Sequence, residues 1–285
     1  MSPFAATLVP LTILLFAGGA RTGGDAAGKE RLRQALEFHQ RAMERTGVLV
    51  PMYVYPGNVD KNPEYTRLMT LRRRYETVPM WVIVNPASGP GEAVDPNYTK
   101  AIARLRGAGC VVVGYVSTSF GKRPAADVKK DIDRWLKLYP GVQGIFFDEM
   151  RNEDTDAAVA YQTALNRYAH DTGCWPTVAN PGTDTPARYF AAPAADVIVV
   201  HEGGDWPKEE RLKRDTYADF PPFTRGILVH SRAKLDKAAL RLARQHARWV
   251  YATEAPFRAG DPKAANPWDR VSAYLEELCT ELSGK

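Results

Sequence analysis

The chain alternates between short apolar runs and longer amphipathic segments, and this alternation limits the folds open to it. Eight apolar runs follow one another over about 240 residues, and a helix-like segment comes after each of them. Strands that alternate with helices form parallel sheets, because a parallel connection needs a crossover long enough to hold a helix. The apolar runs cover residues 49–55, 80–85, 111–116, 144–149, 175–180, 197–201, 227–230 and 249–253.

The helix-like segments complete the repeating unit. They cover residues 64–77, 98–108, 125–139, 154–172, 186–190, 208–217, 235–247 and 268–282. Eight strand–helix units at this length are typical of a closed (β/α)8 barrel. An open doubly wound sheet often carries a glycine-rich phosphate loop, and the sequence contains neither Gly-x-Gly-x-x-Gly nor Gly-x-x-x-x-Gly-Lys-[Ser/Thr]. We therefore predict a single α/β domain, a (β/α)8 TIM barrel over residues 25–285, with an extra N-terminal helix over residues 25–47.

The first 24 residues differ from the rest of the chain. Residues 4–20 carry no charge and end in Ala17-Gly18-Gly19-Ala20, small residues of the kind that a signal peptidase accepts. No Lys or Arg precedes the apolar stretch, and Pro10 interrupts a run that is short for a membrane span. We predict a secretory signal peptide over residues 1–24, with an uncleaved N-terminal anchor as the alternative. The protein would then be secreted or extracytoplasmic, and free of the membrane once the signal is removed.

Composition and charge narrow the range of partners. The formal net charge is +5, and the basic residues are spread over the expected helices without a basic block interleaved with aromatic residues. We expect no nucleic-acid binding and a monomeric protein. Three cysteines are too few for a disulfide scaffold, and none has metal-site spacing to another. Cys110, Cys174 and Cys279 are predicted to be small buried residues.

Polar and aromatic side chains gather at the carboxyl ends of the predicted strands. In a parallel barrel these ends form one rim, and the chemistry of such barrels is carried there. The opposite strand ends hold mainly Gly, Val, Pro and Cys. This asymmetry indicates a functional site on one face. The residues at or next to the polar ends include Tyr55, Asn85, Tyr115, Asp148, Glu149, Asn180, His201, Glu202, His230 and Glu254.

The run Gly-Ile-Phe-Phe-Asp-Glu at residues 144–149 joins an apolar strand to two adjacent carboxylates. Because successive strand side chains point to opposite faces, Asp148 and Glu149 cannot both face inward while the strand stays regular. One is expected to line the barrel mouth, and the other to be directed by a local bend. The structural alternative is that both acids stabilise the first turn of the following helix.

Acids at the ends of the fourth, sixth and eighth strands suggest chemistry on a glycosidic bond. That reaction needs one protonated carboxyl beside the leaving oxygen, and a second carboxylate that activates water or attacks the sugar. Open aromatic residues at the rim, such as Tyr55 and Trp206, could stack on sugar rings or pack between loops.

Four segments taken together resemble one protein family. They are Val-Pro-Met-Tyr-Val-Tyr-Pro at residues 50–56, Ile-Val-Asn-Pro-Ala-Ser-Gly-Pro-Gly at 83–91, Gly-Tyr-Val-Ser-Thr at 114–118 and Gly-Ile-Phe-Phe-Asp-Glu at 144–149. In order and spacing, the chain from about residue 49 to residue 254 resembles the spherulation-specific family 4 (spherulin-type) proteins. The resemblance implies a (β/α)8 barrel and a secreted glycoside hydrolase. Characterised fungal members of the family act on galactosaminogalactan, an exopolysaccharide that contains N-acetylgalactosamine.

The resemblance also implies roles for individual residues. Asp148, Glu149 and Glu202 would be the catalytic acids. We expect Asp148 and Glu202 to form the working pair, in either order of acid and nucleophile or base, while Glu149 tunes or positions its neighbour. We expect a polysaccharide substrate cleaved within the chain, and neither a metal nor a cofactor. The substrate-binding candidates are Tyr55, Asn85, Tyr115, Asn180, His201, His230 and Glu254.

Two other functions stay open at this point. A carbohydrate-binding or cell-surface coat protein would keep the barrel without turnover, although binding alone does not require three carboxylates at one rim. A metal-dependent hydrolase or deacetylase could use His201, His230 and Asp148 as ligands. Against it, the sequence contains no His-x-His or His-Glu-x-x-His pair.

Overall fold

The computed structural model describes residues 45–214, 217–262 and 264–284. Its strands are β1 (Gly47–Met52), β2 (Met80–Val84), β3 (Val111–Ser117), β4 (Gly144–Asp148), β5 (Thr177–Asn180), β6 (Val197–Gly203), β7 (Arg225–Val229) and β8 (Trp249–Ala252). The helices are α2 (Pro63–Arg74), α3 (Pro96–Gly107), α4 (Ala125–Leu138), α5 (Asp156–Asp171), α6 (Ala187–Ala191), α7 (Glu209–Leu212), α8 (Lys237–His246) and α9 (Leu275–Ser283), with a short 3-10 helix η2 (Pro222–Thr224).

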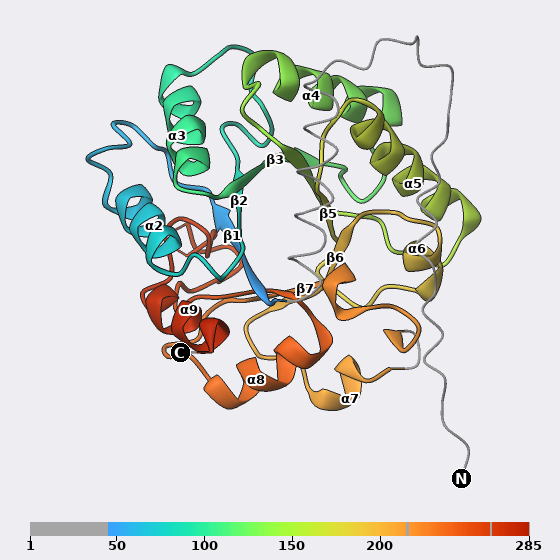
Figure 1. Cartoon of the computed structure of the whole chain (residues 1–285). Helices are drawn as coiled ribbons and strands as arrows, with labels where there is room; N and C mark the ends of the chain where they lie inside the picture. Colours follow the sequence, from blue (N-terminus) through green and yellow to red (C-terminus); the bar gives the residue numbers. More distant parts are fainter. Residues whose placement is uncertain (1–44, 215–216, 263, 285) are drawn as a thin grey trace.

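The strands are parallel and close into a barrel in sequence order, β1 to β8, with β8 beside β1 (Figure 1). The predicted (β/α)8 barrel is confirmed. The predicted signal segment and most of the predicted N-terminal helix lie outside the described residues. At the end of that expected helix, Gly47 opens β1 instead. The largest other differences are in two helices: α7 ends at Leu212 rather than near residue 217, and α9 begins at Leu275 rather than at residue 268.

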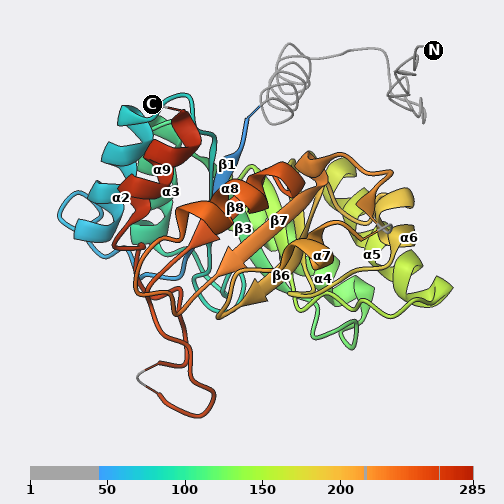
Figure 2. The ribbon, with the colours of Figure 1, turned by 90° about the horizontal axis from the view of Figure 1, so that it is seen from below.

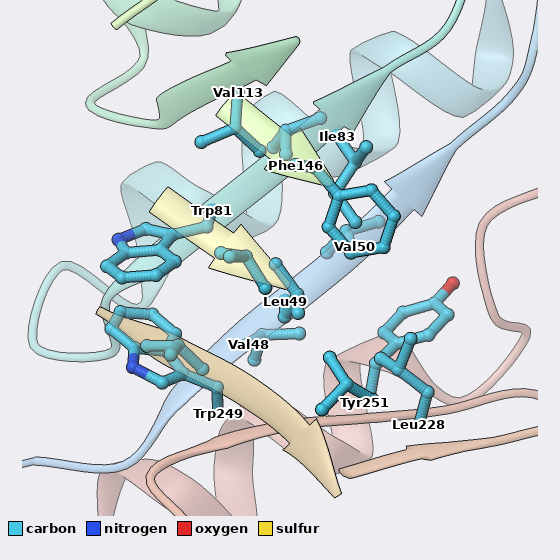
Figure 3. Packing of buried hydrophobic residues seen from close by; sticks show 14 of the residues in the cluster. Val48, Leu49, Val50, Trp81, Ile83, Val113, Phe146, Leu228, Trp249 and Tyr251 are labelled. Carbon is cyan, nitrogen blue, oxygen red and sulfur yellow. The ribbon is translucent and has the colours of Figure 1, made fainter. Parts of the chain in front are cut away.

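Aromatic side chains close the barrel at its amino-terminal end. The rings of Trp81 in β2 and Trp249 in β8 stack with centroids 3.5 Å apart, and both side chains are buried (Figure 3). Such a pair contributes about 0.5–1.5 kcal/mol beyond the burial of its area. Gly47 makes room for it, because a Cβ there would lie 2.6 Å from Trp249 and 2.8 Å from the carbonyl oxygen of Pro79. The interior is therefore a packed core rather than a channel.

The rows of inward-facing side chains continue to the carboxyl-terminal end of the barrel, as the strand register shows. Phe146 in β4 belongs to the interior cluster and pairs in register with Val178 in β5 (Figure 3). Two residues further along, Asp148 pairs with Asn180. Because strand side chains alternate, Asp148 and Asn180 face the same side as Phe146 and Val178. The polar side chains at this end form the last layer of the interior rows.

The helices cover the outside of the barrel (Figure 1). Trp135 of α4 packs on β3, where its indole donates to the carbonyl oxygen of Tyr115 at 2.8 Å. A Cβ at Gly114 would lie 2.6 Å from Trp135, so a glycine is needed for this close packing. The start of a helix is fixed by a side-chain cap in four cases, from Asn62 (α2), Asp95 (α3), Thr155 (α5) and Asp236 (α8).

The strand arrows point to one end of the molecule, and the long loop between β8 and α9 extends from that end (Figure 2). The three cysteines, Cys110, Cys174 and Cys279, are buried, as predicted, and they are unbridged. Within the described part of the chain, no helix combines the length and apolar character that a membrane crossing requires.

Candidate active site

Asn180, at the end of β5, joins carboxylates from the two neighbouring strands. Its Nδ2 donates to Asp148 Oδ1 at 2.9 Å and to Glu202 Oε2 at 2.7 Å. The two carboxylate oxygens therefore lie at most about 5.6 Å apart, and about 5 Å apart when each takes one hydrogen of the planar amide. Because the amide nitrogen must face both acceptors, Asn180 Oδ1 is buried without a protein partner. An unpaired buried acceptor costs roughly 1–3 kcal/mol, which the bridge has to offset.

Burial dominates the protonation of both acids. It raises the pKa of Glu202 to about 7, with support from the charge of Asp148 and against hydrogen bonds from Asn180 and Trp268. Burial also raises the pKa of Asp148, against hydrogen bonds from Tyr115, the Glu149 backbone N–H and Asn180. Asp148 thus accepts more hydrogen bonds that favour its charged form than Glu202 does, and its ordinary pKa is the lower of the two. Asp148 ionises first, and Glu202 keeps its proton to near-neutral pH.

Two tyrosines lie beside this pair of acids. The Tyr115 hydroxyl hydrogen-bonds Asp148, and Tyr53 packs edge-on against Tyr115 with ring centroids 5.7 Å apart. Burial, and then the negative charge of Asp148, raises the pKa of both phenols well above the ordinary value. Both hydroxyls therefore stay protonated and can donate. Our sequence candidates included Tyr115 but missed Tyr53, which lies two residues before the strand end that we predicted.

The loop between β8 and α9 brings Trp268 onto Glu202. The indole N–H of Trp268 donates to the Glu202 carboxylate, and its main-chain carbonyl accepts from the N–H of Tyr53 at 3.1 Å. The ring lies 6.0 Å, centroid to centroid, from both His230 and Tyr251. This contact could not be predicted from the sequence, because the pattern after residue 268 looks helical.

Side chains from elsewhere hold the segment before α9 out of a helix. The consecutive backbone N–H groups of residues 271–273 donate to Glu64, Tyr251 and Glu254 at 2.7–2.8 Å. These bonds replace the intrahelical bonds that would extend α9 towards Trp268. They also show where Glu254 lies: its Oε2 anchors this loop to the end of β8.

An open pocket lies beside Glu202. Its lining comprises Glu202, His230, Phe257 and residues 265–268. His230 follows β7; its Nδ1 lies 3.0 Å from Ser231 Oγ and its ring packs edge-on against Phe257 at 5.4 Å. Of the substrate-binding candidates, the structure brings His230, Tyr115 and Asn180 together with the working acids.

Glu149 turns away from this pair as the strand ends. Its φ is +54°, in the left-handed region that non-glycine residues rarely adopt. Its Oε2 accepts a hydrogen bond from Ser117 Oγ at 2.5 Å, and its carbonyl oxygen accepts from Thr118 Oγ1 at 2.6 Å. As the alternation of strand side chains predicts, Asp148 lines the mouth while a bend directs Glu149 towards the loop after β3.

Tyr55 contacts α3 at the rim, and Asn85 stabilises the turn after β2. Tyr55 is 57% exposed, and its hydroxyl accepts from Asn97 Nδ2 at 2.8 Å while its ring packs on Tyr98. Asn85 Oδ1 accepts from the N–H of Gly89 at 2.9 Å and closes the turn after β2. These contacts place both residues at the rim, beside α3, rather than at the bridge between the acids.

A bulge in β6 decides which residue of the pair His201-Glu202 faces inward. Val199 pairs with Gly226 of β7, but the next paired residue is His201, so one residue is inserted at this point. Val197 and Val199 face the interior, and without the bulge the same row would continue with His201. The extra residue shifts the row so that Glu202 takes the inward position.

His201 consequently packs on the outside of β6. Arg211 donates to its Nδ1 at 2.9 Å, so Nε2 carries the proton and donates to the carbonyl oxygen of Asp205 at 2.7 Å. Burial lowers the pKa of His201, which favours this neutral form. Both ring nitrogens are thus bound by the protein, and the metal-ligand trio considered from sequence is not assembled. Within the described ranges, no group of three or more His, Cys, Asp or Glu side chains is placed to hold a metal ion.

Comparison with known proteins places the chain in a family. Residues 47–282 match the model of spherulation-specific family 4. The chain belongs to this family. Within spherulation-specific family 4 it is similar to Spherulin-4 of Physarum polycephalum, with 33% identity over 158 residues. That match covers 55% of this chain and 45% of Spherulin-4, so the chain spans less than half of that relative.

Solved structures agree with the spherulation-specific family 4 fold. The chain is similar to Aspergillus clavatus Sph3 in complex with GalNAc, with a TM-score of 0.71 and 25% identity over 84% of this chain and 98% of Sph3. It also shares its barrel with a β-mannanase of Thermomonospora fusca in complex with mannotriose. There the TM-score is 0.50 and the identity 14%, over 84% of this chain and 89% of the mannanase, a likeness of fold alone.

Proposed function

We propose that this protein is a secreted glycoside hydrolase that cleaves an amino-sugar-containing exopolysaccharide of the galactosaminogalactan type. The observation that carries the proposal is the bridge at Asn180. It holds two partly buried carboxylates of different proton affinity side by side at the carboxyl ends of barrel strands. Family membership and the GalNAc complex of Sph3 support an amino-sugar polymer as the substrate. An exopolysaccharide lies outside the cell, which agrees with the signal peptide expected over residues 1–24.

The two proton affinities assign the roles. Glu202, with a pKa of about 7, keeps a proton that it donates to the glycosidic oxygen as the bond to the anomeric carbon breaks. Ionised Asp148 attacks that carbon from the opposite side and forms a covalent glycosyl ester. Glu202, now a carboxylate, takes a proton from the water that attacks the same carbon. This second step releases the sugar and restores both acids.

The spacing of the acids favours retention of anomeric configuration. Retaining glycosidases hold their two carboxyl groups about 5–5.5 Å apart, whereas inverting enzymes leave about 6.5–9.5 Å for a water molecule. The oxygens bridged by Asn180 lie at most about 5.6 Å apart, by the two hydrogen-bond lengths given above. Tyr53 and Tyr115 are placed to donate to the sugar or to Asp148, and His230 to contact it from the pocket beside Glu202.

Reducing-sugar release from galactosaminogalactan tests this function. We expect release by the parent protein and a loss of about 10²–10⁴-fold in Asp148→Asn and Glu202→Gln. Glu92→Gln is the matched control, because Glu92 is an exposed acid in the loop after β2, at the same rim. NMR of the first product gives the anomeric configuration. Inversion would remove Asp148 as nucleophile, full activity in either acid variant would remove that residue, and binding without release by the parent would indicate a carbohydrate-binding protein.

A further inference from the structure

In the part of the chain that the structure describes, the large exposed apolar side chains are concentrated on one rim. Within the described residues, the large hydrophobic residues that remain exposed are Tyr55, Val94, Phe120 and Phe257, with exposed fractions of 46–57%. They lie in the loops after β1, β2, β3 and β8, at the same end of the barrel as the acids. These four strands are consecutive neighbours around the closed barrel.

The remaining strands, β4 to β7, carry the polar part of the rim. Asp148, Asn180, Glu202 and His230 lie at their carboxyl ends. We call this arc the polar arc; the neighbouring arc carries the exposed apolar residues, together with Asn85, Tyr115 and Glu254. The loops after β3 and β8 border the polar arc on its two sides, so Phe120 and Phe257 flank the acids.

Phe257 lies on the Glu202 side. Its ring packs against His230 at 5.4 Å, and it lines the pocket that contains Glu202. Its backbone N–H donates to Ser231 Oγ at 3.0 Å, which ties the start of the long loop to the end of β7. A half-exposed ring is thus fixed at the edge of the pocket.

Phe120 lies on the Asp148 side. Its N–H donates at 2.8 Å to the carbonyl oxygen of Glu149, the residue that follows Asp148. Ser119 and Phe120 both have a positive φ, +48° and +55°. A bulky residue in this region is unfavourable, and burial of the ring does not compensate, since the side chain remains 54% exposed. The backbone is held in a costly conformation that keeps an apolar ring at the surface beside the acids.

We infer that Phe120 and Phe257 are sugar-stacking residues at two subsites on opposite sides of the Asp148–Glu202 pair. A polysaccharide chain would then cross the rim with one pyranose ring near each phenylalanine and the scissile bond between them. This inference rests on the proposed function for its substrate, and it adds the residues that make the enzyme prefer a polymer and cut within it.

A polysaccharide chain is the ligand that fits these rings, because both lie next to the acids. The Phe257 ring packs on His230, which lines the same pocket as Glu202. The backbone of Phe120 is bonded to the backbone of Glu149, the residue after Asp148. A sugar chain offers a flat face of C–H groups at each residue, which suits separate aromatic rings, and burying those faces is favourable. A protein partner on the same rim would cover the carboxylates and prevent turnover.

Truncation of the two rings tests the inference. In Phe120→Ala and Phe257→Ala we expect the KM for galactosaminogalactan to rise about tenfold while kcat changes much less. The parent should bind oligosaccharides more tightly as they lengthen, and each variant should lose part of that gain. Phe→Trp at either position should restore the parent KM. Val94→Ala is the matched control, because it truncates an exposed apolar residue of the same rim that does not border the acids.

Binding of the polymer without turnover separates this inference from the proposed function. The Asp148→Asn protein, with or without each truncation, is run through gels containing galactosaminogalactan, and its retardation is measured. Weaker retardation after loss of either ring supports the subsites even if the parent releases no sugar. Parent-like retardation and parent-like KM in both truncated variants would overturn them while leaving hydrolysis intact. Since both rings are exposed, an unchanged Tm confirms that each variant is folded.

Discussion

The indole N–H of Trp268 donates to the carboxylate of Glu202, although Glu202 lies in β6 and Trp268 follows β8 in the sequence. This contact opposes the rise in pKa that burial produces in Glu202. The loop before α9 therefore influences the proton affinity of the acid that we assign as the proton donor. Because the same loop lines the pocket, substrate binding and acid strength depend on one segment.

Replacing Trp268 with Phe should move the alkaline limb of kcat/KM to higher pH. The variant keeps a ring but removes a donor that favours the charged form of Glu202, so the pKa of Glu202 rises further above about 7. The pH–rate profile measures the shift. Trp206→Phe is the control, since the indole nitrogen of Trp206 is buried without a hydrogen-bond partner. A limb that stays in place or moves down in Trp268→Phe would contradict the assignment.

The parent profile of kcat/KM should be bell-shaped. Its alkaline limb should fall near pH 7, where Glu202 loses its proton, and its acidic limb should lie above 3.8, because burial raises the pKa of Asp148. Glu202→Gln should abolish the alkaline limb. The loss of rate in that variant should be smaller for an activated aryl glycoside than for the polymer, since a good leaving group needs no proton. Equal losses on both substrates would argue against Glu202 as the acid.

Asn180→Ala should shift both limbs of the profile to higher pH. The amide lowers the pKa of each acid by donating to it, so its removal raises both values. The carboxylates also lose the group that fixes their spacing, and we expect kcat to fall about 10²-fold or more. Asn85→Ala removes an amide that closes a turn at the same rim and should leave the limbs unchanged. A fall in rate with an unshifted profile would limit Asn180 to substrate contact.

Glu202 should cost the protein stability at alkaline pH. Its pKa is raised from 4.5 to about 7 on folding, so its favourable contribution is complete below pH 4.5 and is lost as pH rises through 7. The full shift corresponds to roughly 3 kcal/mol. Glu202→Gln lacks this dependence, and its Tm should exceed that of the parent by several °C at pH 8 but not at pH 4.5. Thermal melts of both proteins at the two pH values test this. A Tm difference that does not change with pH would contradict a raised pKa of Glu202 in the folded protein.

Two histidines from the same rim should behave differently on substitution. His201 is bound by Arg211 and by the Asp205 carbonyl on the outside of β6, so His201→Ala should lower stability by about 1–3 kcal/mol with little effect on KM. His230 lines the pocket beside Glu202, and His230→Ala should raise KM with a smaller effect on stability. Denaturant unfolding and steady-state kinetics on both variants test this. A large increase of KM in His201→Ala would contradict its structural role.

The barrel and its first acid could be predicted because they follow from local periodicity. The sequence shows apolar runs of strand length with helical segments between them. It also shows a regular strand up to Asp148, in which side chains point alternately to the two faces. The same alternation explains why Glu149 must turn aside. Tyr53 lies inside the expected first strand and Tyr55 lies at its expected end, so a search of the strand ends selects Tyr55 and misses Tyr53.

The rest of the site depends on contacts that the local sequence does not encode. Trp268 reaches Glu202 only because distant side chains capture the backbone N–H groups of residues 271–273, which would otherwise favour a longer α9. The bridging geometry of Asn180 depends on the register between β4, β5 and β6. Asn-Pro at residues 180–181 has the same local pattern as at residues 85–86, where the amide only closes a turn.

Because of the bulge in β6, the inward position of Glu202, our proposed proton donor, depends on the number of residues in the strand. Losing the single codon for Val200 would leave every acid of the protein in the gene. If the strand then paired regularly with β7, an imidazole would face Asn180 and the carboxylate of Glu202 would face outward. An insertion or deletion between Val199 and His201 can thus separate Glu202 from Asp148 while both acids are still present in an alignment.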